Sequence, residues 1–246
     1  MRRRFAALVL VLALLIVVGV SCQASKEFIA QLHKGRGGFL ASQGHYDEAL
    51  TEYSKAMELN PESLLTLLSR ASTYIEMGNY ERAIADCNRA AAMAPNEVDV
   101  YTVRAAAYFN AGQYEMAIAD CDLAIYLRPT SVDAYFNRGS AYSKLGQLES
   151  ALDDFNTVIT LDPNRGRAYD ARGTIYGSEG RYDQAISDFS KAIQLNYSYS
   201  YYNRGITYKL YGKKAEAIAD FNKFLSLTND PELVEKATQQ IAELSK

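Results

Sequence analysis

The sequence predicts an all-α fold, a solenoid of about six helix-turn-helix repeats that ends in a C-terminal capping helix. A glycine lies five residues before each of six regularly spaced alanines, and an aromatic residue or a cysteine lies four residues after each. The alanines are 34 residues apart, except for a last step of 32: Ala49, Ala83, Ala117, Ala151, Ala185 and Ala217. A period of this length indicates an array whose copies bury their apolar faces against one another.

The first residues have the pattern of an export signal. Three arginines, Arg2 to Arg4, precede an apolar run of 16 residues, Phe5–Val20. Spanning a bilayer takes about 20 apolar residues, so this run suits the apolar part of a signal peptide better than a membrane span. We therefore expect residues 1–21 to be a signal peptide and the protein to be exported.

The end of this segment resembles a bacterial lipoprotein signal, in which small residues precede a cysteine that is acylated and becomes the new N-terminus. The resemblance implies lipidation of Cys22, a tether over residues 22–27, and a location on the cell membrane or outer membrane, facing the periplasm or the cell exterior. Gly19 stands where that family usually has leucine. A plain secretory signal or an uncleaved anchor are the alternatives.

Each repeat is expected to hold two amphipathic helices, A and B. The glycine suits the turn between them, and a proline ends helix B in the first four copies, since proline cannot continue a helix. The repeats are predicted over residues 30–63, 64–97, 98–131, 132–165, 166–197 and 198–229.

After the sixth repeat, Asp230 is a suitable N-cap and Pro231 a suitable first helical residue, so a capping helix is predicted over residues 230–246. The solenoid domain then extends over residues 28–246.

The recurring spacing within one copy resembles the tetratricopeptide repeat, or TPR, whose pattern is W-x2-L-G-x2-Y, then A-x3-F, then P. The fourth copy carries it at Tyr135, Arg138, Gly139, Tyr142, Ala151, Phe155 and Pro163. Tyrosine replaces the usual tryptophan, and arginine replaces the usual leucine in every copy. The resemblance implies a protein that binds a peptide or a partner protein in a concave groove lined by the A helices.

The family's groove positions fall beside the packed stripe of each A helix and offer apolar side chains with amides between them. The resemblance implies these partner-binding residues: Leu65, Leu68, Ser69, Ile75, Thr102, Phe109, Asn110, Phe136, Asn137, Lys144, Asp170, Tyr202 and Asn203. Packing against a neighbouring helix is the alternative for each apolar residue among them. We expect Phe109 and Phe136 to form the centre of the site, because aromatic residues often carry most of the binding energy.

The repeated arginine always has an acidic residue 16 positions later, on helix B. We interpret these as structural ion pairs, since the planar guanidinium can bind a carboxylate at two points. The pairs are Arg70 with Asp86, Arg104 with Asp120, Arg138 with Asp154, Arg172 with Asp188, and Arg204 with Asp220; Arg36 and Glu52 are their counterparts in the first copy. A row of charges that binds an anionic partner is the alternative.

Composition argues against several other functions. The formal charge is −3, and the chain has no basic block outside its first residues, so nucleic-acid binding is not expected. Only two histidines are present, His33 and His45, and no catalytic or phosphate-binding motif occurs, so we expect neither an enzyme nor a metal or cofactor. Cys87 and Cys121 occupy equivalent places in successive repeats, too far apart for a disulfide, and are expected to be buried thiols.

The two resemblances imply a non-enzymatic protein-interaction scaffold or adaptor, a membrane-anchored lipoprotein with TPR repeats that takes part in assembling envelope machinery. A self-associating protein whose groove is occupied by its own partner chain, a homodimer, is the first alternative. An enzyme with an unrecognised site is the second.

Overall fold

The computed structural model describes residues 23–245, and these are helical with no strand among them, which confirms the all-α prediction. The predicted signal peptide and Cys22 lie outside the described residues. The predicted tether is helical from residue 23 onward. Within the described part of the chain, no helix combines the length and apolar character needed to cross a membrane. The chain divides into two compact units, on either side of Gly112 and Gln113.

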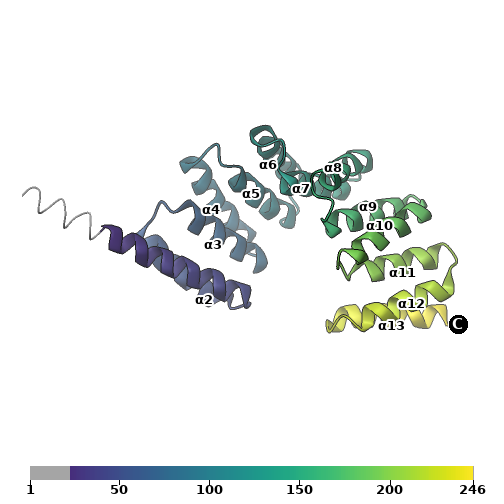
Figure 1. Ribbon diagram of the computed structural model, residues 1–246. Coiled ribbons are helices and arrows are strands. Elements are labelled where there is room, and N and C mark those ends of the chain that lie inside the picture. Colours follow the sequence, from purple (N-terminus) through teal and green to yellow (C-terminus); the bar gives the residue numbers. More distant parts are fainter. Residues whose placement is uncertain (1–22, 246) are drawn as a thin grey trace, which may run out of the picture. The chain divides into compact units, whose positions relative to one another are not determined.

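Unit 1 consists of the N-terminal helix (residues 23–42) and four further helices, packed so that neighbours in sequence are neighbours in space (Figure 1). Its core lies between these helices and includes Leu67, Ala71, Cys87, Val100 and Ala107. The four helices are α2 (Tyr46–Leu59), α3 (Leu64–Glu76), α4 (Tyr80–Met93) and α5 (Val98–Asn110).

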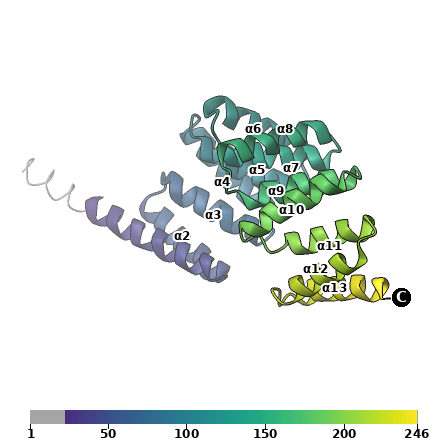
Figure 2. The same ribbon diagram turned by 45° about the vertical axis from the view of Figure 1, so that its right-hand side comes forward.

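Unit 2 continues the same arrangement of paired helices, which is clear from two directions (Figures 1 and 2). Part of its core is formed by Ala151, Phe155 and Ile175. The helices are α6 (Tyr114–Leu127), α7 (Val132–Lys144), α8 (Leu148–Leu161), α9 (Gly166–Ser178), α10 (Tyr182–Gln194), α11 (Ser200–Leu210), α12 (Lys214–Leu225) and α13 (Pro231–Leu244).

The turn from helix A to helix B explains the repeated glycine. In the second repeat Gly78 has φ of 73°, in the left-handed region that residues with a Cβ rarely adopt. Its N–H donates to the carbonyl of Ile75, and the N–H of Asn79 donates to that of Tyr74, at 2.9 and 2.8 Å. This is the Schellman arrangement, which satisfies the last carbonyls of the helix.

The shortened fifth repeat closes with a different turn. Asn196, with φ of 64°, takes the left-handed conformation, which asparagine tolerates better than most residues. The N–H of Tyr197 then donates to the carbonyl of Ala192 at 2.9 Å. α11 therefore begins at Ser200, after a connection without the proline of the first four copies.

At the C-terminus, Asp230 caps α13, accepting hydrogen bonds from the N–H groups of Glu232 and Leu233 at 2.9 and 3.3 Å. Ala237 is the buried residue of this helix.

Candidate functional site

Within each unit, the first helices of the repeats contribute to one face, which we call the A-helix face. In unit 1 this face has a pocket of about 370 Å³ between the N-terminal helix and α3. In unit 2 it has a pocket of about 240 Å³ between α9 and α11. The first is lined by Ala41, Tyr46, Tyr53, Ser69, Ser72, Thr73 and Glu76. The second is lined by Thr174, Gly177, Ser178, Phe189, Asn203, Ile206, Thr207 and Leu210.

The two pockets occupy the same place in the repeat. When positions are counted from the repeated arginine, six of them occur in both linings. The residues at these positions are Ala41 and Gly177, Tyr53 and Phe189, Ser69 and Asn203, Ser72 and Ile206, Thr73 and Thr207, and Glu76 and Leu210. A serine and a carboxylate in unit 1 are thus an isoleucine and a leucine in unit 2. The pocket of unit 1 suits a polar or basic group, and that of unit 2 an apolar one.

The wall of the apolar pocket of unit 2 contains a glycine, Gly177, where the pocket of unit 1 has Ala41. A Cβ on Gly177 would lie 3.4 Å from the hydroxyl of Thr207, at the edge of van der Waals contact. Leu210 is 59% exposed at the rim. A glycine inside a helix costs about 0.5–1 kcal/mol relative to alanine, so the pocket has a cost in stability.

A buried polar cluster lies beside this pocket. The Asp170 carboxylate accepts hydrogen bonds from the Ser200 hydroxyl at 2.5 Å and from the Asn203 amide at 3.0 and 3.1 Å. Burial raises the pKa of Asp170 above its ordinary value, and the two hydrogen bonds oppose that shift. Asn203 is therefore held in one orientation at the wall of the pocket.

The repeated arginines bridge helices rather than project into the A-helix face. Arg138 contacts both oxygens of Asp154, and the same two-point contact joins Arg70 to Asp86, Arg172 to Asp188 and Arg204 to Asp220, at 2.7–2.9 Å. The remaining nitrogen of Arg172 donates to Asn156, in the helix B of the preceding repeat, at 2.6 Å. One side chain thus joins three helices.

Tyrosines complete this arrangement. The guanidinium of Arg138 lies 5.5 and 5.9 Å from the ring centres of Tyr135 and Tyr142, one helical turn away on either side. Such cation–π contacts add favourable energy to a group whose charge is already paired. Arg104 and Asp120 fall in different units.

The first repeat departs from this pattern. Glu52 accepts a hydrogen bond from Lys55 at 2.9 Å and lies 2.6 Å from the ring nitrogen of His33, whereas Arg36 reaches it only at 4.0 Å. The hydrogen bonds with His33 and Lys55 lower the pKa of Glu52 to about 2.

Models of the tetratricopeptide repeat match residues 40–107, 105–172, 166–199 and 198–231, most of the chain. The chain belongs to the TPR family. Among solved structures, MamA is 27% identical over 65% of this chain and 94% of its own, with a TM-score of 0.55. TTC0263, a thermophilic TPR protein of Thermus thermophilus, is 25% identical over 68% and 91%, with a TM-score of 0.62.

A TPR protein of Parabacteroides merdae ATCC 43184 shares the fold, with 24% identity over 87% of this chain and 84% of its own and a TM-score of 0.73. No curated protein matches the sequence. The TPR fold and these neighbours support a protein-interaction scaffold.

The structure places most of the expected TPR groove residues at the surface, but not all. Leu65, Asn110 and Lys144 are exposed, and the half-buried ones are Ser69, Ile75, Thr102, Phe109, Phe136, Asn137, Tyr202 and Asn203. Leu68 and Asp170 are instead buried. Leu68 belongs to the core of unit 1, and the Asp170 carboxylate is taken up by Ser200 and Asn203, so neither offers a free side chain to a partner.

The proposed aromatic centre is also divided, because Phe109 belongs to unit 1 and Phe136 to unit 2. The Phe136 ring packs against Phe155, with ring centres 5.7 Å apart, and the guanidinium of Arg167 lies 4.9 Å from the centre of the Phe136 ring. Sequence reasoning missed Arg167, whose place over Phe136 depends on how successive repeats stack.

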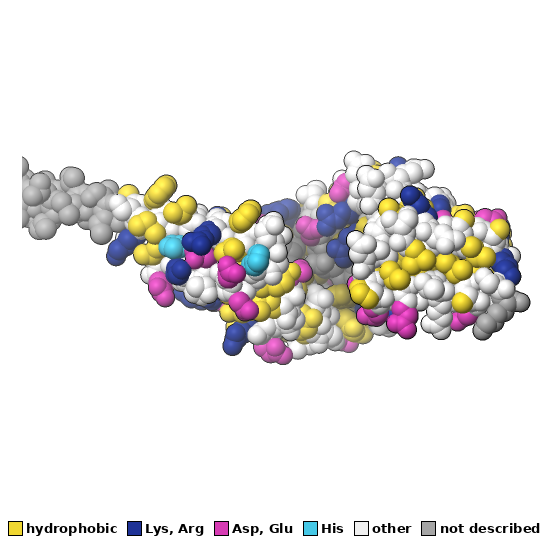
Figure 3. Space-filling model, turned by 90° about the horizontal axis from the view of Figure 1, so that it is seen from below, with side chains coloured by type: hydrophobic (Ala, Val, Ile, Leu, Met, Phe, Trp, Pro, Cys, Tyr) yellow, Lys and Arg dark blue, Asp and Glu magenta, His cyan; other side chains and the backbone are white. Residues whose placement is uncertain are grey.

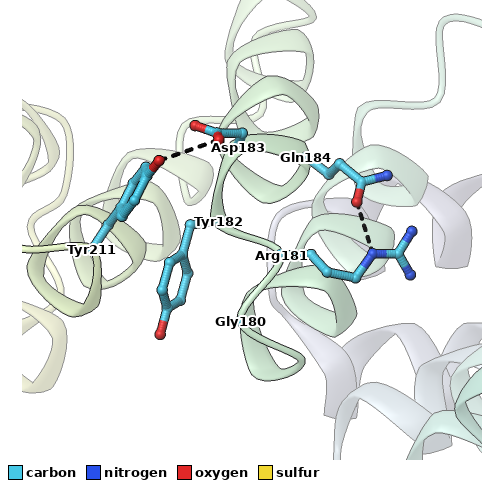
Figure 4. A pocket seen from close by; sticks show the side chains of 6 residues that line it. All are labelled: Gly180, Arg181, Tyr182, Asp183, Gln184 and Tyr211. Atoms are coloured by element: carbon cyan, nitrogen blue, oxygen red, sulfur yellow. Dashed lines mark hydrogen bonds between the residues drawn. The ribbon is translucent and has the colours of Figure 1, made fainter.

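A third cavity, of about 360 Å³, lies at the turn between α9 and α10 (Figure 4). Its polar groups bond one another: Tyr211 donates to Asp183 at 3.2 Å, and Arg181 donates to Gln184 at 2.7 Å. The rings of Tyr182 and Tyr211 are 5.2 Å apart. These contacts fasten the turn to the end of α11, so we do not include this cavity in the candidate site.

Proposed function

We propose that this TPR protein is a non-enzymatic adaptor, which binds a peptide or partner protein along its A-helix face and is held at a membrane by its N-terminus. The observation that carries the binding proposal is the pair of equivalent pockets with opposite chemistry. Packing between repeats alone does not explain why Gly177 and an exposed Leu210 occur together.

Each pocket selects one kind of side chain. In unit 2, Ile206 and Leu210 offer apolar surface to a leucine-like or aromatic side chain, and the fixed amide of Asn203 can pair with a peptide group, since buried peptide groups require partners. In unit 1, Ser69, Ser72 and Glu76 suit a polar or basic side chain. A partner side chain that enters the pocket of unit 2 would therefore be apolar, and one that enters the pocket of unit 1 would be polar or basic.

The membrane part of the proposal comes from the sequence. The apolar run Phe5–Val20 and the following Cys22 support export and acylation. Export would place the scaffold in the cell envelope. The chain resembles lipoproteins that carry TPR repeats, and such proteins assemble envelope machinery.

The binding proposal is tested by recovering partners from membranes with the tagged full-length chain. Leu210→Asp should strongly reduce recovery of a partner while leaving the circular dichroism melt unchanged, because Leu210 is mostly exposed. Leu123→Asp, on the B helix α6, is the matched control and should recover the partner fully. Equal recovery by both variants would contradict a role for this pocket, and recovery of the chain itself alone would favour the homodimer.

The anchor is tested separately with Cys22→Ser. The wild type should remain with membranes after a high-salt wash, and the variant should be released or remain unprocessed, because acylation supplies the stable attachment. Identical fractionation and processing of the two proteins would contradict lipidation of Cys22.

A further inference from the structure

Two positions of each A helix are buried in repeats two to six. They lie four residues before and three residues after the repeated arginine. In repeats two to six they are Thr66 and Thr73, Val100 and Ala107, Ala134 and Ala141, Ala168 and Ile175, and Ser200 and Thr207. All ten are at most 3% exposed. We call these two positions of an A helix its seam. The seam is therefore buried in every copy after the first.

In the first repeat the same positions are Leu32 and Phe39, which are 63% and 66% exposed. Phe28 lies one turn before Leu32 and is 71% exposed. The three side chains share one side of the N-terminal helix, since they are spaced by four and seven residues. Ala30 and Gly37 on the opposite side are buried, and Gly37 faces the ring of Tyr53. The helix thus has two apolar faces, and one of them is not covered by any other residue among those that the structure describes.

This exposed face differs from what the open end of a solenoid needs. Terminal repeats usually turn a polar face outward, as α13 does with Glu235, Gln239 and Glu243. The N-terminal helix instead carries a leucine and two phenylalanines, and hydrophobic side chains project at this end of the described chain (Figure 3). Whatever covers them must accept large side chains.

The size of Leu32 and Phe39 argues against another repeat packing on this face. In the closed seams nine of the ten residues are no larger than valine, and Ile175 is the exception. A second copy stacked in the same way would meet Leu32 and Phe39 where the seam holds threonine and alanine. A fluid apolar phase has no fixed shape and accepts such side chains without that conflict.

The charge of the N-terminal helix and its position in the chain indicate that this apolar phase is a lipid bilayer. The N-terminal helix carries Lys26, Lys34 and Arg36 against the single acid Glu27, whereas residues 43–246 hold 20 basic and 28 acidic residues. Arg36 projects beside the apolar face with its side chain 68% exposed. Phe28 lies only eight residues after the end of the apolar run Phe5–Val20. A basic helix with an aromatic face is the pattern of a helix that lies in a bilayer interface.

We propose that the N-terminal helix lies flat on an anionic lipid bilayer, with Phe28, Leu32 and Phe39 in the boundary between headgroups and acyl chains. Arg36, four residues after Leu32 and three before Phe39, lies on the same side of the helix and contacts the lipid phosphates. The inference rests on the proposed membrane anchoring, and adds that the first repeat itself docks on the lipid instead of standing off on a flexible tether.

The absence of tryptophan from the sequence gives a direct test. The full-length chain is reconstituted into vesicles of phosphatidylethanolamine and phosphatidylglycerol, with Phe39→Trp as the reporter and Tyr126→Trp as the matched control. Tyr126 is 82% exposed on α6, in unit 2. The Phe39→Trp emission should shift to shorter wavelength and be quenched by brominated lipid. The control should keep its emission in water and be quenched by iodide.

The other outcomes separate the two proposals. Protein that floats with the vesicles while Phe39→Trp behaves like the control would overturn the interfacial helix and leave the anchor intact. A blue shift without quenching by brominated lipid would mean that protein covers this face, and would also overturn it. Protein that fails to float would overturn the anchor and the helix together. Quenching that is as strong in phosphatidylcholine vesicles would overturn the role given to the basic side chains.

Discussion

Arg138 donates two hydrogen bonds to Asp154, at 2.9 Å from Nε and 2.8 Å from Nη2, and a third, at 2.6 Å, to Asp122 of the preceding helix B. Asp154 is almost fully buried, whereas Asp122 is about half exposed. The pair with Asp154 therefore replaces lost hydration, and the contact with Asp122 adds little beyond orientation. The hydrogen bond with Asp154 raises the pKa of Arg138, which stays protonated.

Arg138→Ala should destabilise unit 2 by about 3 kcal/mol, because it leaves the Asp154 carboxylate buried without its partner. The double change Arg138→Leu, Asp154→Leu should restore much of this loss, since an apolar pair of similar volume can replace a buried ion pair. Urea melts followed by circular dichroism measure both.

The matched control is Arg165→Ala. Arg165 pairs with Asp133 in the same unit, but both side chains are more exposed, so the loss should be below about 1 kcal/mol. Equal losses for Arg138→Ala and Arg165→Ala would show that Asp154 is hydrated despite its burial.

Sequence periodicity was enough to predict the fold and four of the pairs, those of Arg70, Arg138, Arg172 and Arg204. A fixed interval of 16 residues between arginine and acid is preserved in every copy, so the partner within the repeat could be named. The third contact, to Asp122 or Asn156, could not be named, because it joins helices of successive repeats and depends on how the repeats stack. Cys87 and Cys121 are buried and not joined by a disulfide, as their equivalent positions predicted.

The candidate site was less predictable for the same reason. The sequence pattern assigns Asp170 to the groove. In the structure its carboxylate is instead bonded by Ser200 and Asn203 of the next repeat, which follow the two-residue shortening near Asn196. The paired pockets could have been found only by comparing wall positions between distant copies. Such a comparison requires knowing which residues line a wall.

Gly177→Ala should stabilise the protein by about 0.5–1 kcal/mol, because alanine favours a helix and the new methyl group would be in ordinary van der Waals contact with Thr207 and Ala185. Thermal melts would show this as a higher midpoint. The same methyl group narrows the apolar pocket, so partner recovery should fall while stability rises.

Gly205→Ala is the control for this change, in the neighbouring A helix α11. Its Cβ would lie 2.8 Å from the ring of Phe221, which is fully buried and cannot move freely, so the protein should lose stability. If both glycine variants melt below the wild type, the wall at Gly177 is tighter than the structure shows.

Glu52 should make stability depend on pH in the acid range. Its pKa is lowered from 4.5 to about 2 in the folded protein, chiefly by hydrogen bonds with His33 and Lys55. The ionised carboxylate thus stabilises the fold fully above pH 4.5, and this contribution is lost as the pH falls toward 2. In urea melts, the difference in stability between wild type and Glu52→Gln should shrink over this range.

The difference in stability between wild type and His33→Ala should also shrink as the pH falls, but from a smaller value. This change removes the first of the two hydrogen bonds to Glu52, while the one from Lys55 remains. A difference between wild type and Glu52→Gln that stays constant from neutral pH to pH 2 would mean that the carboxylate is not held by these groups.

Phe136 decides whether the aromatic side chains of the A-helix face serve packing or binding. Its ring packs on Phe155 in the core of unit 2, so Phe136→Ala should cost about 2 kcal/mol, less than a fully buried phenylalanine would. Arg167→Ala removes the exposed cation over the same ring together with its hydrogen bond to Tyr197, and should cost about 0.5–1 kcal/mol. If Phe136→Ala melts like the wild type yet no longer recovers a partner, the ring belongs to the binding site, and the packing with Phe155 contributes little to stability.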